Sequence, residues 1–209
     1  MTDTQLQDYL ERTGAVAEPP SHAALSRLLL AHVTTFPFDT IDVLLGQHPG
    51  VGLATVRDKL VGRGRGGYCF EHARIFHSVL EALGYDAELI LGRVGDPQAA
   101  PRTHLAVVVT LDGVRLLCDP GIGLPPREPI ELRDGVVLGG GIWRHMIREV
   151  DEGRGGPAWQ LWRERSDGWE LMHTMDELPE LLARLGIRLD GPEATDLAER
   201  VRGLRRDAA

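Results

Sequence analysis

One stretch of the chain, residues 63–71, reads Arg63-Gly64-Arg65-Gly66-Gly67-Tyr68-Cys69-Phe70-Glu71. Its glycines interrupt regular structure, and an apolar pattern with helical spacing follows at once, from His72 to Leu83. Cys69 therefore lies in the first turn of a predicted helix. The positive end of the helix dipole and the unpaired N–H groups of that turn both favour a thiolate. Because a thiolate is a nucleophile, Cys69 is the first candidate catalytic residue.

The composition sets outer limits on what the chain can be. It has 209 residues, of which 43% are apolar and 26% charged, as in a globular protein of one large domain or two small ones. A net charge of −8 argues against nucleic acid as a partner. No apolar run approaches the roughly 18 residues that span a bilayer, and the N-terminus lacks a signal-peptide layout. We therefore expect a cytoplasmic protein without a membrane partner, whose two cysteines, Cys69 and Cys118, are free thiols.

The first 84 residues have the pattern of helices. Gly14 stops the first helix, Ser21 caps the second, and the Gly-rich stretch stops the third. The expected helices run over 6–12, from Ser21 to the break at Phe36-Pro37-Phe38, over 53–60, and from Cys69 to Gly84.

The pattern then changes to strands rich in Val, Leu and Ile. The dipeptides Asp112-Gly113, Asp134-Gly135 and Asp167-Gly168 are hairpin signals, and successive antiparallel hairpins predict a small barrel. The sequence thus predicts an α+β protein: a helical bundle over 1–84, an antiparallel β-barrel over 85–175, and a short helical segment over 176–209. The expected strands cover 87–94, 104–111, 114–119, 142–150, 158–165 and 169–175.

A nucleophilic cysteine needs a base and a group that orients the base. His104 opens one strand of the Asp112-Gly113 hairpin and Asp119 closes the other. A two-residue turn fixes the register, so His104 and Asp119 should lie side by side at the open end of the hairpin. The contact of this pair with Cys69 is tertiary and does not follow from the register.

Each of these residues also has a plainer interpretation. A lone cysteine is most often a small buried hydrophobe, a histidine at a strand start is often satisfied locally, and an aspartate before Pro-Gly often forms a turn. His72, one helical turn after Cys69, is a rival base without a visible orienting acid. Cys118 should point to the face of the strand opposite Asp119 and belong to the core.

Two further motifs are weak. The spacing Gly62-x-Gly64-x-x-Gly67 matches a dinucleotide fingerprint but follows a helix rather than a strand. Zinc ligation by Cys69, His72 and His77 lacks the usual ligand spacing, so we expect no metal. No partner is visible in the sequence for the remaining histidines, which are His22, His32, His48, His145 and His173.

Four motifs resemble those of the arylamine N-acetyltransferase family, and they occur along the chain in the order that the family has. Residues 65–71 resemble its nucleophile motif, Thr103-His104-Leu105 its histidine motif, and Asp119-Pro120-Gly121-Ile122-Gly123 its aspartate and glycine loop. Upstream, Phe36-Pro37-Phe38-Asp39-Thr40-Ile41-Asp42 is similar to an early motif of the family. The resemblance covers roughly residues 5 to 145.

The resemblance implies a Cys69-His104-Asp119 triad in a helical domain, a β-barrel and an α/β lid. It implies that acetyl-coenzyme A, or another acyl-coenzyme A, acylates the cysteine and that a small amine then takes the acyl group. It also implies an ion pair of Arg65 with Asp39 beneath the site, and oxyanion donors among the N–H groups around Cys69. The substrate- or cofactor-binding positions that it implies are Phe38, Arg65, Gly67, Tyr68, Thr103, Gly121, Ile122 and Gly123.

Two departures from the family affect the expected substrates. Ile122 stands where the family generally has an aromatic residue, so the acceptor could be an aliphatic amine, a hydrazine or a hydroxylamine. The chain also lacks several tens of residues of the lid, which predicts a more open cleft. Alternatives are an amide synthase that uses an acyl carrier protein, a transglutaminase-like cysteine hydrolase, and a degenerate binding module.

Overall fold

Two helix boundaries of the N-terminal part lie where the sequence predicts them, at Gly14 and at Ser21, whereas the first helix begins at Asp3 rather than at residue 6. In the computed structural model, which describes residues 1–97, 99–151 and 157–176, the Ser21 side chain accepts the N–H of Ala24 at 3.2 Å. Gly14 closes the first helix with a left-handed backbone, at φ 68°. The helices are α1 (Asp3–Thr13), α2 (His22–Thr35), α3 (Ile41–Leu44), α4 (Leu53–Arg57), the π-helical turn Asp58–Gly62, and α5 (Cys69–Ala82).

Two of these elements differ from the prediction. The short helix α3 was not expected, because four residues are too few for a periodic apolar pattern. The helix expected over 53–60 is α4, which continues as the π-helical turn as far as Gly62. The helices expected beyond residue 176 lie outside the described residues.

All strand pairs of the sheet are antiparallel. The spatial order is β4-β3-β2-β1-β8-β7-β6-β5, so the second half of the sheet joins the first through β1 and β8. The strands are β1 (Asp86–Arg93), β2 (Arg102–Leu111), β3 (Val114–Cys118), β4 (Ile130–Glu131), β5 (Val137–Leu138), β6 (His145–Asp151), β7 (Pro157–Arg165) and β8 (Gly168–Asp176), with a 3-10 turn at Gly141–Trp143.

The link between the two edge strands nearly closes the sheet into a barrel. The N–H of Leu132 donates to the Arg115 carbonyl on β3, and the N–H of Gly135 donates to the Ile147 carbonyl on β6, each at 2.9 Å. The expected hairpin at Asp134-Gly135 is therefore wrong. Its turn lies in this link, because β4 pairs with β3 and β5 pairs with β6.

The two other hairpins are present. Leu111 faces Val114 across Asp112-Gly113, and both turn residues have positive φ, at 51° and 77°. Arg165 faces Gly168 at the tip of β7 and β8, so that turn is made one residue earlier than the motif suggests.

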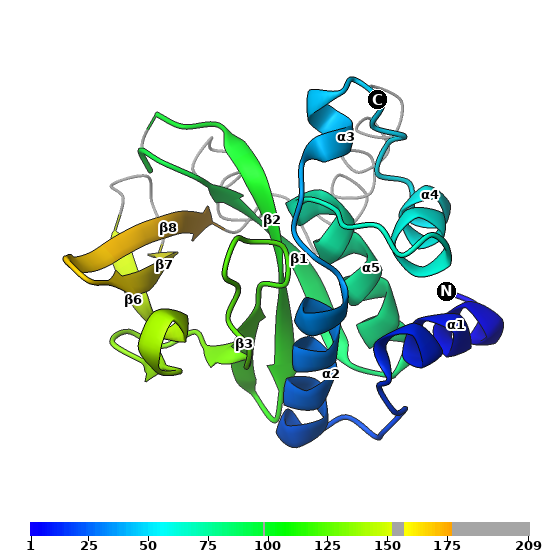
Figure 1. The fold of residues 1–209 in the computed structure, drawn as a ribbon. Coiled ribbons are helices and arrows are strands. Elements are labelled where there is room, and N and C mark those ends of the chain that lie inside the picture. Colours follow the sequence, from blue (N-terminus) through cyan, green and yellow to red (C-terminus); the bar gives the residue numbers. More distant parts are fainter. Residues whose placement is uncertain (98, 152–156, 177–209) are drawn as a thin grey trace, which may run out of the picture.

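Strand β2 is buried on both faces, which places the helices and the barrel interior on opposite sides of one strand. Val107 and Val109 pack with the helices, whereas Ala106 and Val108 pack inside the barrel. Helix α5 lies along β1 and β2, with α1, α2 and α4 beside it (Figure 1). In the described part of the chain, no helix combines the length and the apolar character needed to cross a membrane.

Candidate active site

Cys69 is the first residue of α5 and is 7% exposed. The helix begins there because Glu71 reaches back and accepts the N–H of Tyr68 at 3.1 Å. The thiol of Cys69 lies against the imidazole of His104, and its sulfur lies 3.5 Å from the Thr103 carbonyl oxygen. The start of α5 therefore faces the start of β2.

The early Phe36–Asp42 segment holds the loop before Cys69 in place. Phe38 and Gly67 form a parallel β-bridge, in which the N–H of Gly67 donates to the Pro37 carbonyl at 3.1 Å. The N–H of Asp39 donates to the Gly67 carbonyl at 2.8 Å. A side chain on Gly66 would meet the Pro37 carbonyl and Asp39, so only glycine permits this close approach.

A loop from the barrel covers the other side of Cys69. A Cβ on Gly121 would lie 2.6 Å from the Cα of Cys69, so the backbone of this loop packs directly against Cys69. The side chain of the next residue, Ile122, is 8% exposed, whereas Gly123 is exposed and a Cβ there would meet nothing within 4 Å.

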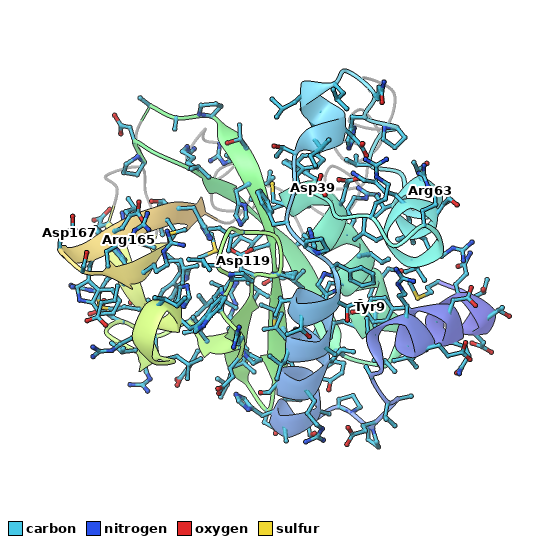
Figure 2. The ribbon with its side chains drawn as sticks, viewed as in Figure 1. Tyr9, Asp39, Arg63, Asp119, Arg165 and Asp167 are labelled. Atoms are coloured by element: carbon cyan, nitrogen blue, oxygen red, sulfur yellow. The ribbon has the colours of Figure 1, made fainter. Side chains whose placement is uncertain are left out.

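His104 and Asp119 lie where the hairpin register predicts. The register is confirmed by the pairs Val107–Cys118 and Val108–Leu117, and Nε2 of His104 lies 2.9 Å from Oδ2 of Asp119. Figure 2 shows Asp119 where the barrel meets the helical side. Since Nε2 of His104 faces the carboxylate, Nδ1 is the ring nitrogen left for Cys69.

The electrostatics favour a charged imidazole at His104. Burial opposes the charge, but the carboxylate of Asp119 and the contact with Cys69 outweigh it and raise the pKa of His104 to about 10. Burial would also raise the pKa of Asp119, yet hydrogen bonds and charge from His104 and His173 hold it well below its usual range. This arrangement can accept a proton from a thiol and stabilise the resulting cation.

A second histidine binds the same carboxylate, a contact that the sequence does not predict. Nε2 of His173 lies 2.7 Å from Oδ2 of Asp119, and both side chains are fully buried. The contact depends on the pairing of β8 with β1, which brings together residues far apart in the chain. The one signal available in the sequence was Gly92, a glycine inside a strand, where a Cβ would lie 3.2 Å from Nδ1 of His173.

His72 is not placed to act as the rival base. Its Nε2 lies 3.1 Å from the Gly67 carbonyl oxygen and must donate there, so its Nδ1 is an acceptor. Nε2 of His32 lies 2.8 Å from that Nδ1, and the Tyr9 hydroxyl lies 2.9 Å from Nδ1 of His32. Both nitrogens of His72 are thus occupied, in a buried chain that runs from Tyr9 through His32 and His72 to Gly67.

In this hydrogen-bonded series, burial favours the neutral form of His32 and His72, whereas the charged form is favoured at His104. It lowers the pKa of His72 to about 4, and burial together with the neighbouring His72 lowers that of His32. We therefore assign both as neutral imidazoles that carry their proton on Nε2.

The expected ion pair of Arg65 with Asp39 is wrong. Arg65 bonds to Asp42 at 2.8 Å instead, because Oδ1 of Asp39 accepts the N–H of Ile41 at the start of α3. Asp42 also bonds to Lys59 at 3.0 Å, and Lys59 binds both carboxylate oxygens of Glu71 at 2.9 Å. Lys59 and Glu71 are almost fully buried, so this network supports the start of α5 from beneath.

The other positions implied by the resemblance differ in burial and in their contacts. Phe38 is 43% exposed and Thr103 is exposed, with its carbonyl facing the Cys69 sulfur. Tyr68 is partly buried, and burial together with Glu71 and Cys69 raises its pKa to about 12. The Gly123 carbonyl accepts a hydrogen bond from Arg163 at 3.0 Å. Cys118 is a free thiol in the core on the helical side, where burial raises its pKa.

His104, Asp119 and His173 have the residue types of a metal site. Their ligand atoms lie within 4.8 Å of one another, and all three side chains are buried. The facing atoms are already joined by the two hydrogen bonds to Oδ2, which account for the arrangement without an ion. The Cys69, His72 and His77 set does not converge, since His72 bonds to His32 and His77 bonds to the Ala87 carbonyl and Glu81.

Comparison with known proteins agrees with this geometry. A family model described as N-acetyltransferase matches residues 22–185. An arylamine N-acetyltransferase of Escherichia coli is 34% identical over 158 residues, which are 73% of this chain and 54% of the relative. One of Mycolicibacterium smegmatis is 36% identical over 63% of this chain and 52% of its own length. The solved arylamine N-acetyltransferase of Mycobacterium abscessus superposes with a TM-score of 0.77 at 33% identity, over 87% of this chain and 67% of that one.

The chain therefore belongs to the arylamine N-acetyltransferase family, whose α+β fold it shares. It spans about half the length of these curated relatives.

Proposed function

We propose that this chain transfers an acetyl group, or another acyl group, from a coenzyme A thioester to a small amine, hydrazine or hydroxylamine. The observation that carries the proposal is the thiol of Cys69 at the start of α5, in contact with an imidazole that a buried carboxylate holds. This is the arrangement that a thiol nucleophile requires. We assign Cys69, His104 and Asp119 as the catalytic residues.

In the first half of the reaction, the Cys69 sulfur attacks the thioester carbonyl. Nδ1 of His104 takes the thiol proton and returns it to the departing coenzyme A sulfur, which leaves an acetyl thioester on Cys69. Backbone N–H groups at the start of α5 are unpaired within the helix and face the developing oxyanion.

In the second half, the nitrogen of the amine attacks the thioester on Cys69. Nδ1 of His104 accepts a proton from that nitrogen, and the Cys69 sulfur leaves and recovers a proton. The amide is released and the free thiol returns, so the transfer needs no net oxidation or reduction. Asp119 stays ionised throughout and fixes the tautomer of His104.

For the coenzyme A pyrophosphate we propose the loop at Gly121 and Gly123. The support is that Gly123 is exposed with open space at its Cβ position, while Gly121 brings the loop against Cys69. Exposed backbone N–H groups of a glycine loop can bind phosphate oxygens.

For the acceptor we propose an amine whose binding does not depend on stacking at residue 122. Ile122 is aliphatic and its side chain is almost buried, so it offers little surface to a ring. The exposed aromatic near Cys69 is Phe38, in the segment bridged to Gly67.

We also propose that the two regions, 1–84 and 85–175, act as two domains with the site at their junction. A cytoplasmic location is consistent with two free thiols and an acyl-coenzyme A donor. The relatives described above are arylamine N-acetyltransferases, which favours this reaction over amide synthesis from a carrier protein or cysteine hydrolysis.

The test is intact-mass spectrometry after incubation with acetyl-coenzyme A. We expect one added acetyl group of about 42 Da on the wild type and on Cys118→Ala, and none on Cys69→Ala. The Cys118 variant is the matched control, because this thiol is fully buried in the core. A small amine, hydrazine or hydroxylamine should then discharge the adduct. An adduct that persists in Cys69→Ala, or no adduct with any acyl-coenzyme A, would overturn the proposal.

A further inference from the structure

His173 and His104 share one oxygen of Asp119. Nε2 of His173 lies 2.7 Å and Nε2 of His104 lies 2.9 Å from Oδ2, and the two ring centres are 4.3 Å apart. Gly92 faces His104 across β1 and β2, and the absence of a side chain there leaves space for the ring of His173. Two buried imidazoles are therefore packed against one buried carboxylate.

The hydrogen bonds fix the protons of this cluster. A carboxylate only accepts, so each histidine must carry a proton on its Nε2. Nδ1 of His104 faces Cys69, but Nδ1 of His173 is buried and has no hydrogen-bond partner among the described residues. A second proton on His173 would create a buried donor without an acceptor beside the cation of His104.

The two rings therefore differ in charge. Burial and then the charge of His104 lower the pKa of His173, and Asp119 only partly offsets them. Among the described residues, the ionisable groups that act on His173 are these two, His104 on β2 and Asp119 directly after β3.

We propose that His173 is a positioning residue for the second half of the reaction: its neutral imidazole donates to Asp119 and reduces the hold of that carboxylate on the proton of His104. This inference rests on the proposed function, since it concerns the step in which His104 takes a proton from the amine.

Acylation of Cys69 removes one of the interactions that keep His104 charged, which is why a positioning residue is needed. In the free enzyme the contact with Cys69 helps to keep His104 charged. A thioester on Cys69 has neither the charge nor the proton, so His104 then depends on Asp119 alone against the opposing effect of burial. A second donor on Asp119 shifts this balance toward neutral His104, which is the form that can act as a base.

The direct test is histidine NMR in the Cys69→Ala background, which imitates the loss of the thiol and needs no substrate. We expect the His104 resonances, assigned through His104→Gln, to titrate at higher pH when His173→Phe is added. His173→Gln should leave the titration near that of the parent, because the carboxamide also donates an N–H and cannot ionise. Titration of His104 at the same pH with Phe and with His at 173 would overturn the proposal.

A kinetic test uses acetylated enzyme prepared in advance. We expect discharge by an amine at neutral pH to slow roughly tenfold in His173→Phe, as for loss of a hydrogen bond to a charged group, and to recover at higher pH. Acylation by acetyl-coenzyme A should change much less, and His173→Gln should restore most of the discharge rate. Equal slowing of both half-reactions at every pH would mean a structural role only.

His77→Gln is the control, because His77 bonds to the Ala87 carbonyl and lies outside the cluster. It should leave both half-reactions unchanged. If the wild type is not acylated by any acyl-coenzyme A, the proposed function fails, and the NMR comparison still decides the role of His173.

Discussion

The molecule contains two pairs of buried histidines: both members of one pair have a lowered pKa, whereas in the other pair the pKa of one member is lowered and that of the other is raised. On the helical side, His32 and His72 bond to each other, and burial lowers the pKa of both. At the barrel, His104 and His173 lie equally deep, yet the pKa of His104 is raised to about 10. The difference is the carboxylate of Asp119, which the helical pair lacks. Burial lowers the pKa of an imidazole, and one carboxylate contact does not reverse this at His173, whereas His104, which contacts both Asp119 and Cys69, has a raised pKa.

The largest effect is expected from Asp119→Asn, which makes the barrel pair resemble the helical pair. Without the carboxylate, burial should win and His104 should become neutral with its tautomer unfixed. We expect the acylation rate to fall by about four orders of magnitude, as when an orienting aspartate is removed from a triad. Single-turnover acylation measures this, with circular dichroism to verify the fold. Turnover near that of the wild type would remove Asp119 from the mechanism.

Lys59→Met tests whether the buried charges on the helical side stabilise the fold rather than act in the reaction. It would leave the buried carboxylate of Glu71 without its cation, and breaking a buried pair in this way costs about 3–5 kcal/mol. Urea unfolding should show this loss. The matched control is Arg65→Met, since this half-exposed partner of Asp42 should contribute less than about 1 kcal/mol. Equal losses in the two variants would contradict the buried network.

Acid should weaken the helical pair, because burial lowers the pKa of both of its histidines. Below pH 6.5 the unfolded chain protonates His72, whereas the folded chain does not until its pKa of about 4 is reached. Stability should therefore fall as the pH drops through this range, by about 1.4 kcal/mol per pH unit for this histidine. The raised pKa of His104 acts in the opposite direction, so its contribution is present below pH 6.5 and is lost as the pH rises toward 10.

Unfolding of His72→Gln at several pH values separates these contributions. Between pH 6.5 and 4, the free energy of unfolding of the variant should depend less steeply on pH than that of the wild type. Its pH dependence in the alkaline range should be unchanged. An unchanged acid slope would mean that His72 is not held neutral.

The smallest effect is expected from Tyr9→Phe, at the far end of the helical chain of hydrogen bonds. It removes the donor to Nδ1 of His32 and keeps the ring, so stability should fall by about 1–2 kcal/mol. The acylation rate should stay within about twofold of the wild-type rate. His32 and His72 separate Tyr9 from Gly67 in the loop before Cys69. A large kinetic loss with little change in stability would show that the helical chain takes part in the reaction.

The sequence predicted the parts of the site that depend on local rules. A glycine run before an amphipathic pattern located Cys69 at a helix start, and a two-residue turn fixed the register of His104 and Asp119. The contact of this pair with Cys69 came from the family resemblance, since no local rule relates a helix start to the end of a distant hairpin.

The parts that were missed depend on pairing between distant segments. His173 reaches Asp119 only because β8 pairs with β1, and the sequence contains no turn that specifies this pairing. Arg65 was assigned to Asp39, but the short helix α3 presents Asp42 instead. The Asp134-Gly135 turn was read as a hairpin because the two short edge strands beside it could not be predicted.

Lys59 is the only lysine in the sequence, and its side chain is 2% exposed. The surface of this chain therefore presents no lysine amine that an activated ester could reach. Residues 1–209 therefore offer amine-directed dyes and resins no exposed lysine side chain. Under the proposed function, the same feature means that Lys59 does not compete with the acceptor amine for the thioester on Cys69.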